Sequence, residues 1–250
     1  MNYSKHRTIL WITLFALSMG VFEGSIVVYL RALYYPEGFA FPLQPMDHHI
    51  ALTELVRELA SLLMLLSVAI LAGRNLSQRF GWFLYTFAVW DIVYYIHLWL
   101  FLGWPESLLT WDILFLLPVA WTGPVITPVI ISALMITLSL IIYNFNLKSG
   151  NKTKINRKEW ILLIAGASIV FLSFIWDYCR FLIRNLPQEE LHQKSLRDQL
   201  FDLSAQYIPV QFPWGIFLLG VLVLIFSFWR FYRRNKVIPN TSQKKAANSY

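Results

Sequence analysis

Long apolar stretches alternate with short polar segments along the whole chain. Six of these stretches are long enough to cross a bilayer as a helix, which takes about 20 residues at a rise of 1.5 Å per residue. The predicted spans are residues 9–30, 51–73, 80–103, 122–145, 159–183 and 213–232. The pattern therefore predicts an all-α, polytopic membrane protein, in which residues 1–250 form a single transmembrane domain.

Prolines interrupt the apolar stretch that contains the fourth predicted span. Residues 107–147 are too long for one straight span, and they include Pro118, Pro124 and Pro128. A proline inside a helix removes a backbone hydrogen bond, so it kinks or ends the helix. We therefore expect a short interfacial or re-entrant segment near residues 108–117, followed by a Pro-broken fourth span.

The composition supports a membrane protein and excludes several other classes. Hydrophobic residues make up 57% of the chain and charged residues only 14%, against about 25% charged residues in ordinary soluble domains. The net charge of +7 is spread between the apolar stretches, and no nucleic-acid-binding motif is present, so we predict no nucleic-acid partner. Cys179 is the single cysteine, which excludes intrachain disulfides, thiolate zinc sites and iron–sulfur clusters.

Lysine and arginine gather in alternate polar segments. Both ends of the chain and the segments after the second and fourth spans hold fifteen of the 21 Lys and Arg residues. These residues are Lys5, Arg7, Arg74, Arg79, Lys148, Lys152, Lys154, Arg157, Lys158, Arg230, Arg233, Arg234, Lys236, Lys244 and Lys245. By the positive-inside rule, these segments face the cytoplasm. We therefore predict a multi-pass protein of the cell membrane with cytoplasmic N- and C-termini and a basic, disordered tail over residues 235–250.

The acidic residues have the opposite distribution. Only Glu159 of the 14 Asp and Glu residues falls on the predicted cytoplasmic side. Asp91 lies near the middle of the third span, where an aspartate costs about 2.5 to 3.5 kcal/mol on insertion scales. Glu23, beside the G-x-x-x-G pair Gly20 and Gly24, lies in the first span, where the glycines permit close helix contact.

Ionisable residues from several spans converge on the outer half of the predicted bundle. They are Glu23, Glu54, Arg57, Glu58, Asp91, His97, Asp177 and Arg180, with Asp112, His48 and His49 just above them. This convergence predicts an outward-facing polar pocket among the first, second, third and fifth spans. Residues 31–50 and 104–121 are predicted to cap it.

One interpretation is that these residues only hold the bundle together. Glu54 and Arg57 are three residues apart and can pair on one helix face. Asp177 and Arg180 have the same spacing, and Asp91 is expected to receive hydrogen bonds from tyrosines. The candidate tyrosines are Tyr85, Tyr94 and Tyr95. The chain would then be a non-catalytic subunit of a membrane complex, but its five acids outnumber the two arginines and one histidine available to pair with them.

A second interpretation is a membrane-embedded enzyme that acts on a small or lipid-like substrate. The candidate catalytic residues are Asp91, Glu58, Glu54, Arg57, Glu23, Asp177 and Arg180. Carboxylate and imidazole ligands also suit a divalent metal ion. The candidate metal ligands are His97, Asp91, Glu58 and His49, although no Glu-x-x-His pair is present and Asp91 and His97 do not share a helix face.

A third interpretation is a transporter coupled to protons or cations. Burial disfavours a charged carboxylate, so Asp91 is a candidate proton carrier. A discontinuous fourth helix would also suit a transporter. However, the first three spans do not resemble the last three as a repeat would, and the inner half of the bundle is nearly free of charges. Enzyme, transporter and structural subunit therefore all stay open at this point.

Overall fold

The computed structural model describes residues 3–149, 151–186 and 203–236. Residues 237–250, which form most of the predicted basic tail, lie outside these ranges. In the described part, six helices are long and apolar enough to cross a membrane. They are α1 (Tyr3–Tyr34), α2 (His48–Ala72), α3 (Leu76–Leu102), α4 (Ile126–Lys148), α5 (Arg157–Asn185) and α7 (Trp214–Lys236). The prediction of six apolar spanning helices is confirmed.

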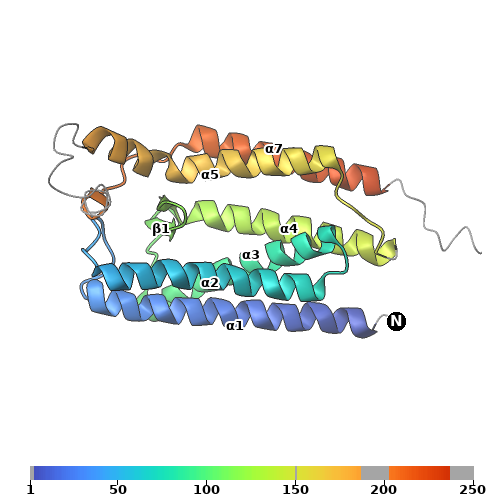
Figure 1. Cartoon of the computed structure of the whole chain (residues 1–250), viewed down its shortest axis with the longest axis horizontal. Helices are drawn as coiled ribbons and strands as arrows, with labels where there is room; N and C mark the ends of the chain where they lie inside the picture. Colours follow the sequence, from blue (N-terminus) through green and yellow to red (C-terminus); the bar gives the residue numbers. More distant parts are fainter. Residues whose placement is uncertain (1–2, 150, 187–202, 237–250) are drawn as a thin grey trace, which may run out of the picture.

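The six helices run along the long axis of the molecule, and successive helices point in opposite directions (Figure 1). The start of α1 and the end of α7 lie at the same end of the bundle. Basic residues of the connections Arg74–Arg79 and Lys148–Lys158 lie at this end as well, because these segments follow α2 and α4. We call it the basic end.

The proline-rich segment before α4 differs from its prediction. It forms strands β1 (Trp111–Phe115) and β2 (Trp121–Pro124), which pair antiparallel with Asp112 opposite Gly123. This β-hairpin lies at the end of the bundle opposite the basic end (Figure 1). We call that end the hairpin end.

The helix that follows the hairpin is continuous, so the break expected within the fourth span is not confirmed. Pro118 lies in the connection between the strands and Pro124 ends β2. Pro128 is the third residue of α4. A proline there removes no helical hydrogen bond, since the first four N–H groups of a helix have no partner within it.

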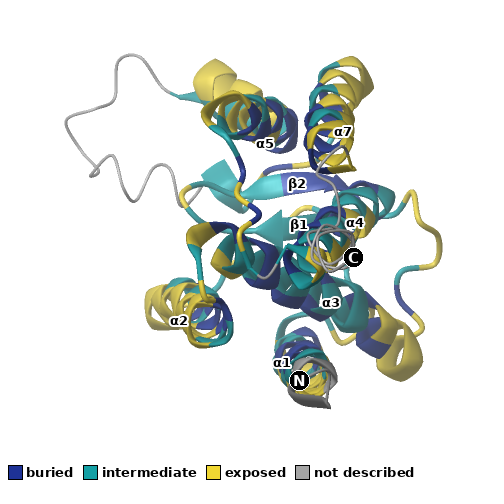
Figure 2. Cartoon of the chain, turned by 90° about the vertical axis from the view of Figure 1, so that its right-hand side faces the viewer, coloured by how far each residue is buried: buried dark blue, intermediate teal, exposed yellow. Residues whose placement is uncertain are grey.

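Close helix contacts divide the bundle into two parts. The α1 helix packs on α3, which also contacts α4 and α2, whereas α5 packs on α7. Figure 2 shows the α5–α7 pair on one side of the strands and the α1–α3 pair on the other, with α2 at the edge. Yellow, exposed surface covers the outer sides of these helices, as expected for apolar faces turned toward lipid (Figure 2).

Glycines permit the closest of these contacts. A Cβ atom on Gly20 would lie 2.8 Å from the carbonyl oxygen of Trp90, and one on Gly24 would lie 2.7 Å from His97, so the G-x-x-x-G pair of α1 faces α3. Gly166 and Gly220 make a similar contact between α5 and α7. Small residues at such positions let helix backbones approach each other.

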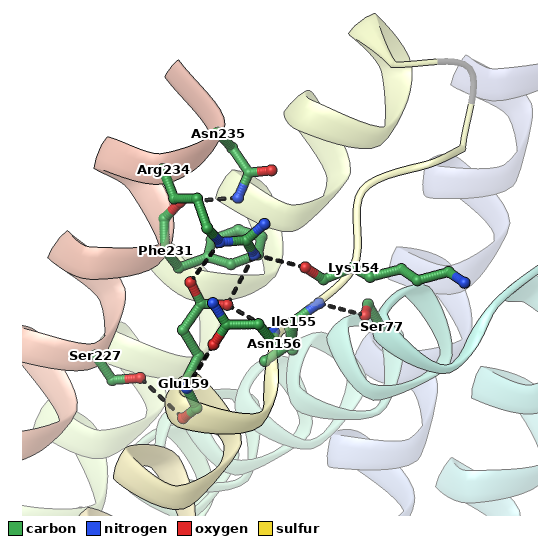
Figure 3. Close-up of polar contacts among 9 residues, drawn as sticks. All are labelled: Ser77, Lys154, Ile155, Asn156, Glu159, Ser227, Phe231, Arg234 and Asn235. Carbon is green, nitrogen blue, oxygen red and sulfur yellow. Dashed lines mark hydrogen bonds and ion pairs between the residues drawn. The ribbon is translucent and has the colours of Figure 1, made fainter. Parts of the chain in front are cut away.

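A buried polar network ties the helices together at the basic end (Figure 3). Asn156 caps α5 and forms a capping box with Glu159, whose side chain is fully buried. Arg234 of α7 donates to both carboxylate oxygens of Glu159 at 2.8 Å and to the carbonyl of Lys154 at 2.6 Å. The single acid that the sequence places on this side is therefore a structural anchor, neutralised by a bidentate arginine.

Candidate functional site

A cavity of about 660 Å³ lies toward the hairpin end of the bundle. Its walls come from α1, α2, α3, the hairpin and α5, together with the segments 35–46 and 204–207. Most of its lining residues are apolar. The ionisable side chains among them are Glu23, Arg31, His48, Glu54, Arg57, Glu58, Asp91 and Asp112, in addition to five tyrosines. Five of the seven candidate catalytic residues thus line one cavity.

An arginine-centred network joins α1 and α2 at the wall of this cavity. Arg57 donates to Glu54 at 2.9 Å, as the three-residue spacing predicted, and forms a second ion pair with Glu23. Ser61 also donates to Glu23, which is almost fully buried. Arg57 therefore compensates the negative charges of Glu23 and Glu54.

Another ion pair links α1 to the hairpin. Arg31 donates to Asp112 at 3.4 Å, and its guanidinium lies 3.6 Å from the ring centroid of Trp104 and 4.4 Å from that of Phe39. The Tyr95 hydroxyl donates to the other oxygen of Asp112 at 3.1 Å. Burial raises the pKa of Asp112 to about 6, although Arg31 and Tyr95 oppose this shift.

The sequence interpretation missed Arg31 as a functional candidate. One signal was present, because Arg31 is a basic residue at the acid-rich outer end of a predicted span. A cation in that position runs against the distribution of the other basic residues. Its partner Asp112 was placed only near the pocket, since nothing in the sequence predicted the hairpin that carries it inward.

Glu58 and Asp91 are held differently from the paired acids. Both oxygens of Glu58 accept the backbone N–H of Leu116, at 3.0 and 3.2 Å, so this side chain fastens α2 to the hairpin. Asp91 accepts the hydroxyl of Ser132 on α4 at 2.8 Å. Neither carboxyl forms an ion pair with a lysine or arginine of the described segments.

The expected tyrosine contacts of Asp91 are replaced by this serine. Tyr95 donates to Asp112 instead, and Tyr85 bonds Thr13 of α1 at 2.9 Å. Tyr94 also lines the cavity, but the described hydrogen bond of Asp91 comes from Ser132 and not from Tyr94. The prediction failed because a helix side chain can reach a neighbouring helix as easily as its own turn, and the sequence does not reveal that neighbour.

Asp177 and Arg180 do not line the cavity. Asp177 accepts the Tyr207 hydroxyl at 2.8 Å and the backbone N–H of Val210 at 3.1 Å, so it fixes the segment that leads into α7. Arg180 is exposed, and the predicted Asp177–Arg180 pair is not among the ion pairs of the described residues. Neither residue therefore belongs to the candidate site.

The four candidate metal ligands are not gathered into a centre. His97 lies against Gly24, 3.3 Å from the Ser25 hydroxyl, and stacks on Phe101. His49 is exposed at the start of α2. Within residues 3–149, 151–186 and 203–236, no group of three or more His, Cys, Asp or Glu side chains is placed to hold a metal ion.

No family model matches the chain, and neither curated proteins nor solved structures gave a match to it. The interpretation of the cavity therefore depends on its own residues. These provide carboxyl groups, two arginines and an apolar wall in one cavity. Such a combination suits binding of a small molecule with an apolar body and proton transfer by carboxyl groups.

Proposed function

We propose that this integral membrane protein is an enzyme that carries out acid–base chemistry on a small, lipid-like molecule bound in the cavity. One observation carries the proposal: Glu58 and Asp91 line the cavity, and within the described residues neither forms an ion pair with an arginine, as Glu23, Glu54 and Asp112 do. Carboxyl groups in an apolar cavity without a cationic partner are the usual candidates for a general acid or base. Glu58 and Asp91 are the proposed catalytic residues, and Arg57 and Glu23 are proposed to position α2.

The orientation in the membrane belongs to the same proposal. Arg74, Lys148 and Arg234 lie at the basic end, together with the start of α1. The positive-inside rule supports a cytoplasmic location for that end. The cavity would then open toward the outer side of the membrane, and its apolar walls would admit a molecule that dissolves in lipid.

A transport role has weaker support. Met19, Leu65 and Trp90 form a buried apolar cluster with Phe15 and other aromatic residues, next to the floor of the cavity. A polar solute would have to cross this layer to reach the basic end. A purely structural role would explain the paired acids, but it does not explain why Glu58 and Asp91 form no ion pair in the part of the chain that the structure describes.

Mass spectrometry of lipid extracts tests the proposed reaction. Cells that express the wild type are compared with cells that express Glu58→Gln, Asp91→Asn or no protein. Molecules consumed or formed by the wild type should stay at the level of the empty control in both variants. Glu106→Gln, an exposed carboxyl outside the cavity, should behave as the wild type. The proposal would be contradicted if the folded variants gave the wild-type lipid profile, or if the wild type gave the same profile as cells without the protein.

A further inference from the structure

Two buried N–H donors at the cavity have no hydrogen-bond partner among the described residues. They are Nη1 of Arg31 and Nε1 of Trp90. Both residues line the cavity, and they are only 7% and 9% exposed. A buried donor without a partner costs about 1 to 3 kcal/mol, so nearly all such groups in proteins are satisfied by something. Because both residues line the cavity, we look for the missing partner in a molecule bound there.

Unsatisfied donors call for a ligand that supplies acceptor atoms. An ammonium group carries only donors and would leave Arg31 and Trp90 unsatisfied. A carboxylate supplies acceptors, but the cavity already contains five carboxyl side chains against two guanidinium groups. A further negative charge would meet this surplus, and like charges in a poorly hydrated space repel strongly. A neutral oxygen acceptor satisfies both constraints.

The contacts of Arg31 also use only part of its hydrogen-bonding capacity. Its Nη2 donates to Asp112, and its flat faces lie against Trp104 and Phe39. These contacts fix the guanidinium plane and leave Nη1 without a bond. The ring of Trp90 is similarly fixed by its edge-to-face contact with Phe87 at 5.0 Å. Both donors are therefore positioned before any ligand arrives, which favours binding.

The other lining residues indicate the chemical nature of the rest of the ligand. Apolar side chains from α1, α2, the hairpin and α5 form the remaining wall, among them Val27, Leu55, Leu114, Val119 and Leu182. We propose that the molecule bound in the cavity is an apolar, chain- or ring-bearing compound whose neutral carbonyl or hydroxyl oxygens accept hydrogen bonds from Arg31 and Trp90. This inference deepens the proposed function, because it depends on the cavity holding a molecule and names its chemical class.

Three probes with equal chain length separate the possible head groups. Wild-type protein in nanodiscs is titrated with methyl undecyl ketone, tridecanoic acid and tridecylamine, and binding is followed by the shift in melting temperature. We expect the neutral ketone to bind and the acid and the amine to bind at least tenfold more weakly. Stronger binding of the acid or the amine than of the ketone would overturn the inference.

Two variants test the donors themselves. Trp90→Phe keeps an aromatic ring but removes Nε1, and we expect it to weaken ketone binding about tenfold, the effect of one buried hydrogen bond. Trp99→Phe on the same helix is the control, because Trp99 is 60% exposed and outside the cavity. Ketone binding that is equal in Trp90→Phe and in the wild type would contradict the proposed role of Trp90.

Removal of Arg31 alone would leave Asp112 buried without its ion-pair partner. The Arg31 substitution is therefore tested in an Asp112→Asn background. Ketone binding is compared between Asp112→Asn alone and Arg31→Met combined with Asp112→Asn, and we expect the double variant to bind about tenfold or more weakly than the single variant. Equal binding by these two proteins would overturn the role of Arg31. If the ketone binds as expected but Glu58→Gln and Asp91→Asn leave the lipid profile unchanged, the proposed reaction fails and the ligand class stands.

Discussion

The charged side chains of the cavity fall into two groups that have different physical states. Glu23, Glu54 and Asp112 have an arginine partner, whereas the hydrogen bonds that Glu58 and Asp91 accept from the described residues come from neutral donors. Paired carboxylates can stay charged in an apolar setting, because the partner compensates for lost hydration. We therefore assign structural roles to the carboxylates paired with arginine and chemical roles to Glu58 and Asp91.

The paired group predicts a large effect on stability when its cation is removed. Arg57→Ala would leave Glu23 buried beside Glu54 without compensation, and breaking such a pair typically costs about 3 to 5 kcal/mol. The melting temperature of the purified protein in detergent measures this loss. Arg79→Ala is the control, because Arg79 is exposed and its side chain donates to the Gly73 carbonyl without forming an ion pair to any described residue. If the two variants have the same melting temperature, Arg57 does not compensate the charge of Glu23.

A double substitution checks the origin of that effect. Glu23→Gln removes the buried charge that Arg57 neutralises, so Arg57→Ala should cost less in this background than in the wild type. Thermal melts of the two single variants and the double variant give the coupling between the side chains. Strictly additive losses would show that the two residues stabilise the bundle independently.

The pH dependence of stability should report on Asp112. Its pKa is raised from 3.8 to about 6 by burial, so the folded protein holds this proton more tightly than the unfolded chain. The stability from this group is fully present below about pH 4 and is lost as the pH rises through about 6, at about 1.4 kcal/mol per pKa unit. In melts between these pH values, Asp112→Asn should lack this decline. Parallel profiles for the two proteins would contradict the raised pKa.

Sequence spacing predicted contacts within one helix better than contacts between elements. The Glu54–Arg57 pair follows from helix geometry alone, and it is present. The Arg31–Asp112 pair joins residues 81 positions apart, and it depends on a hairpin that the apolar pattern did not reveal. Asp177 was placed in the pocket by its depth alone, but the direction of its side chain around α5 could not be known from the sequence.

At the scale of elements, glycine contacts determine how closely α5 and α7 pack. A Cβ atom on Gly220 would lie 2.7 Å from Val170 Cγ2 and 2.9 Å from its backbone nitrogen. Gly220→Ala should therefore force the helices apart and destabilise the protein by about 1 to 3 kcal/mol. Gly215→Ala on the same helix is a matched control, because nothing lies within 4 Å of its Cβ position. Equal melting temperatures would contradict the close contact.

The helices could be predicted from hydropathy, but the hairpin could not. Six apolar stretches of spanning length are a strong signal, because a lipid-facing helix needs little else in its sequence. In the segment before α4, apolar residues, prolines and a glycine are equally consistent with a broken helix or a short hairpin. The positions of Pro118 and Pro124, in the connection and at a strand end, became clear only from the strand register.

At the scale of the whole molecule, the two ends of the bundle carry opposite chemistry. Basic residues and the Glu159–Arg234 anchor lie at one end, whereas the acid-lined cavity lies toward the other. Cysteine labelling in intact cells tests the orientation. In a Cys179→Ser background, Ser107→Cys at the hairpin end should react with an impermeant maleimide, and Lys154→Cys at the basic end should not. The reverse labelling pattern would show that the cavity faces the cytoplasm.

Native mass spectrometry of the purified protein tests the central claim, a cavity that holds a lipid-like molecule, most directly. Wild-type protein released from detergent should retain a small apolar molecule. Ala120→Trp, which fills the cavity from the hairpin, should lose it. Leu71→Trp, on a side chain that is 87% exposed, should retain it. A wild type without a bound molecule, or equal retention by the cavity-filling variant, would contradict the account.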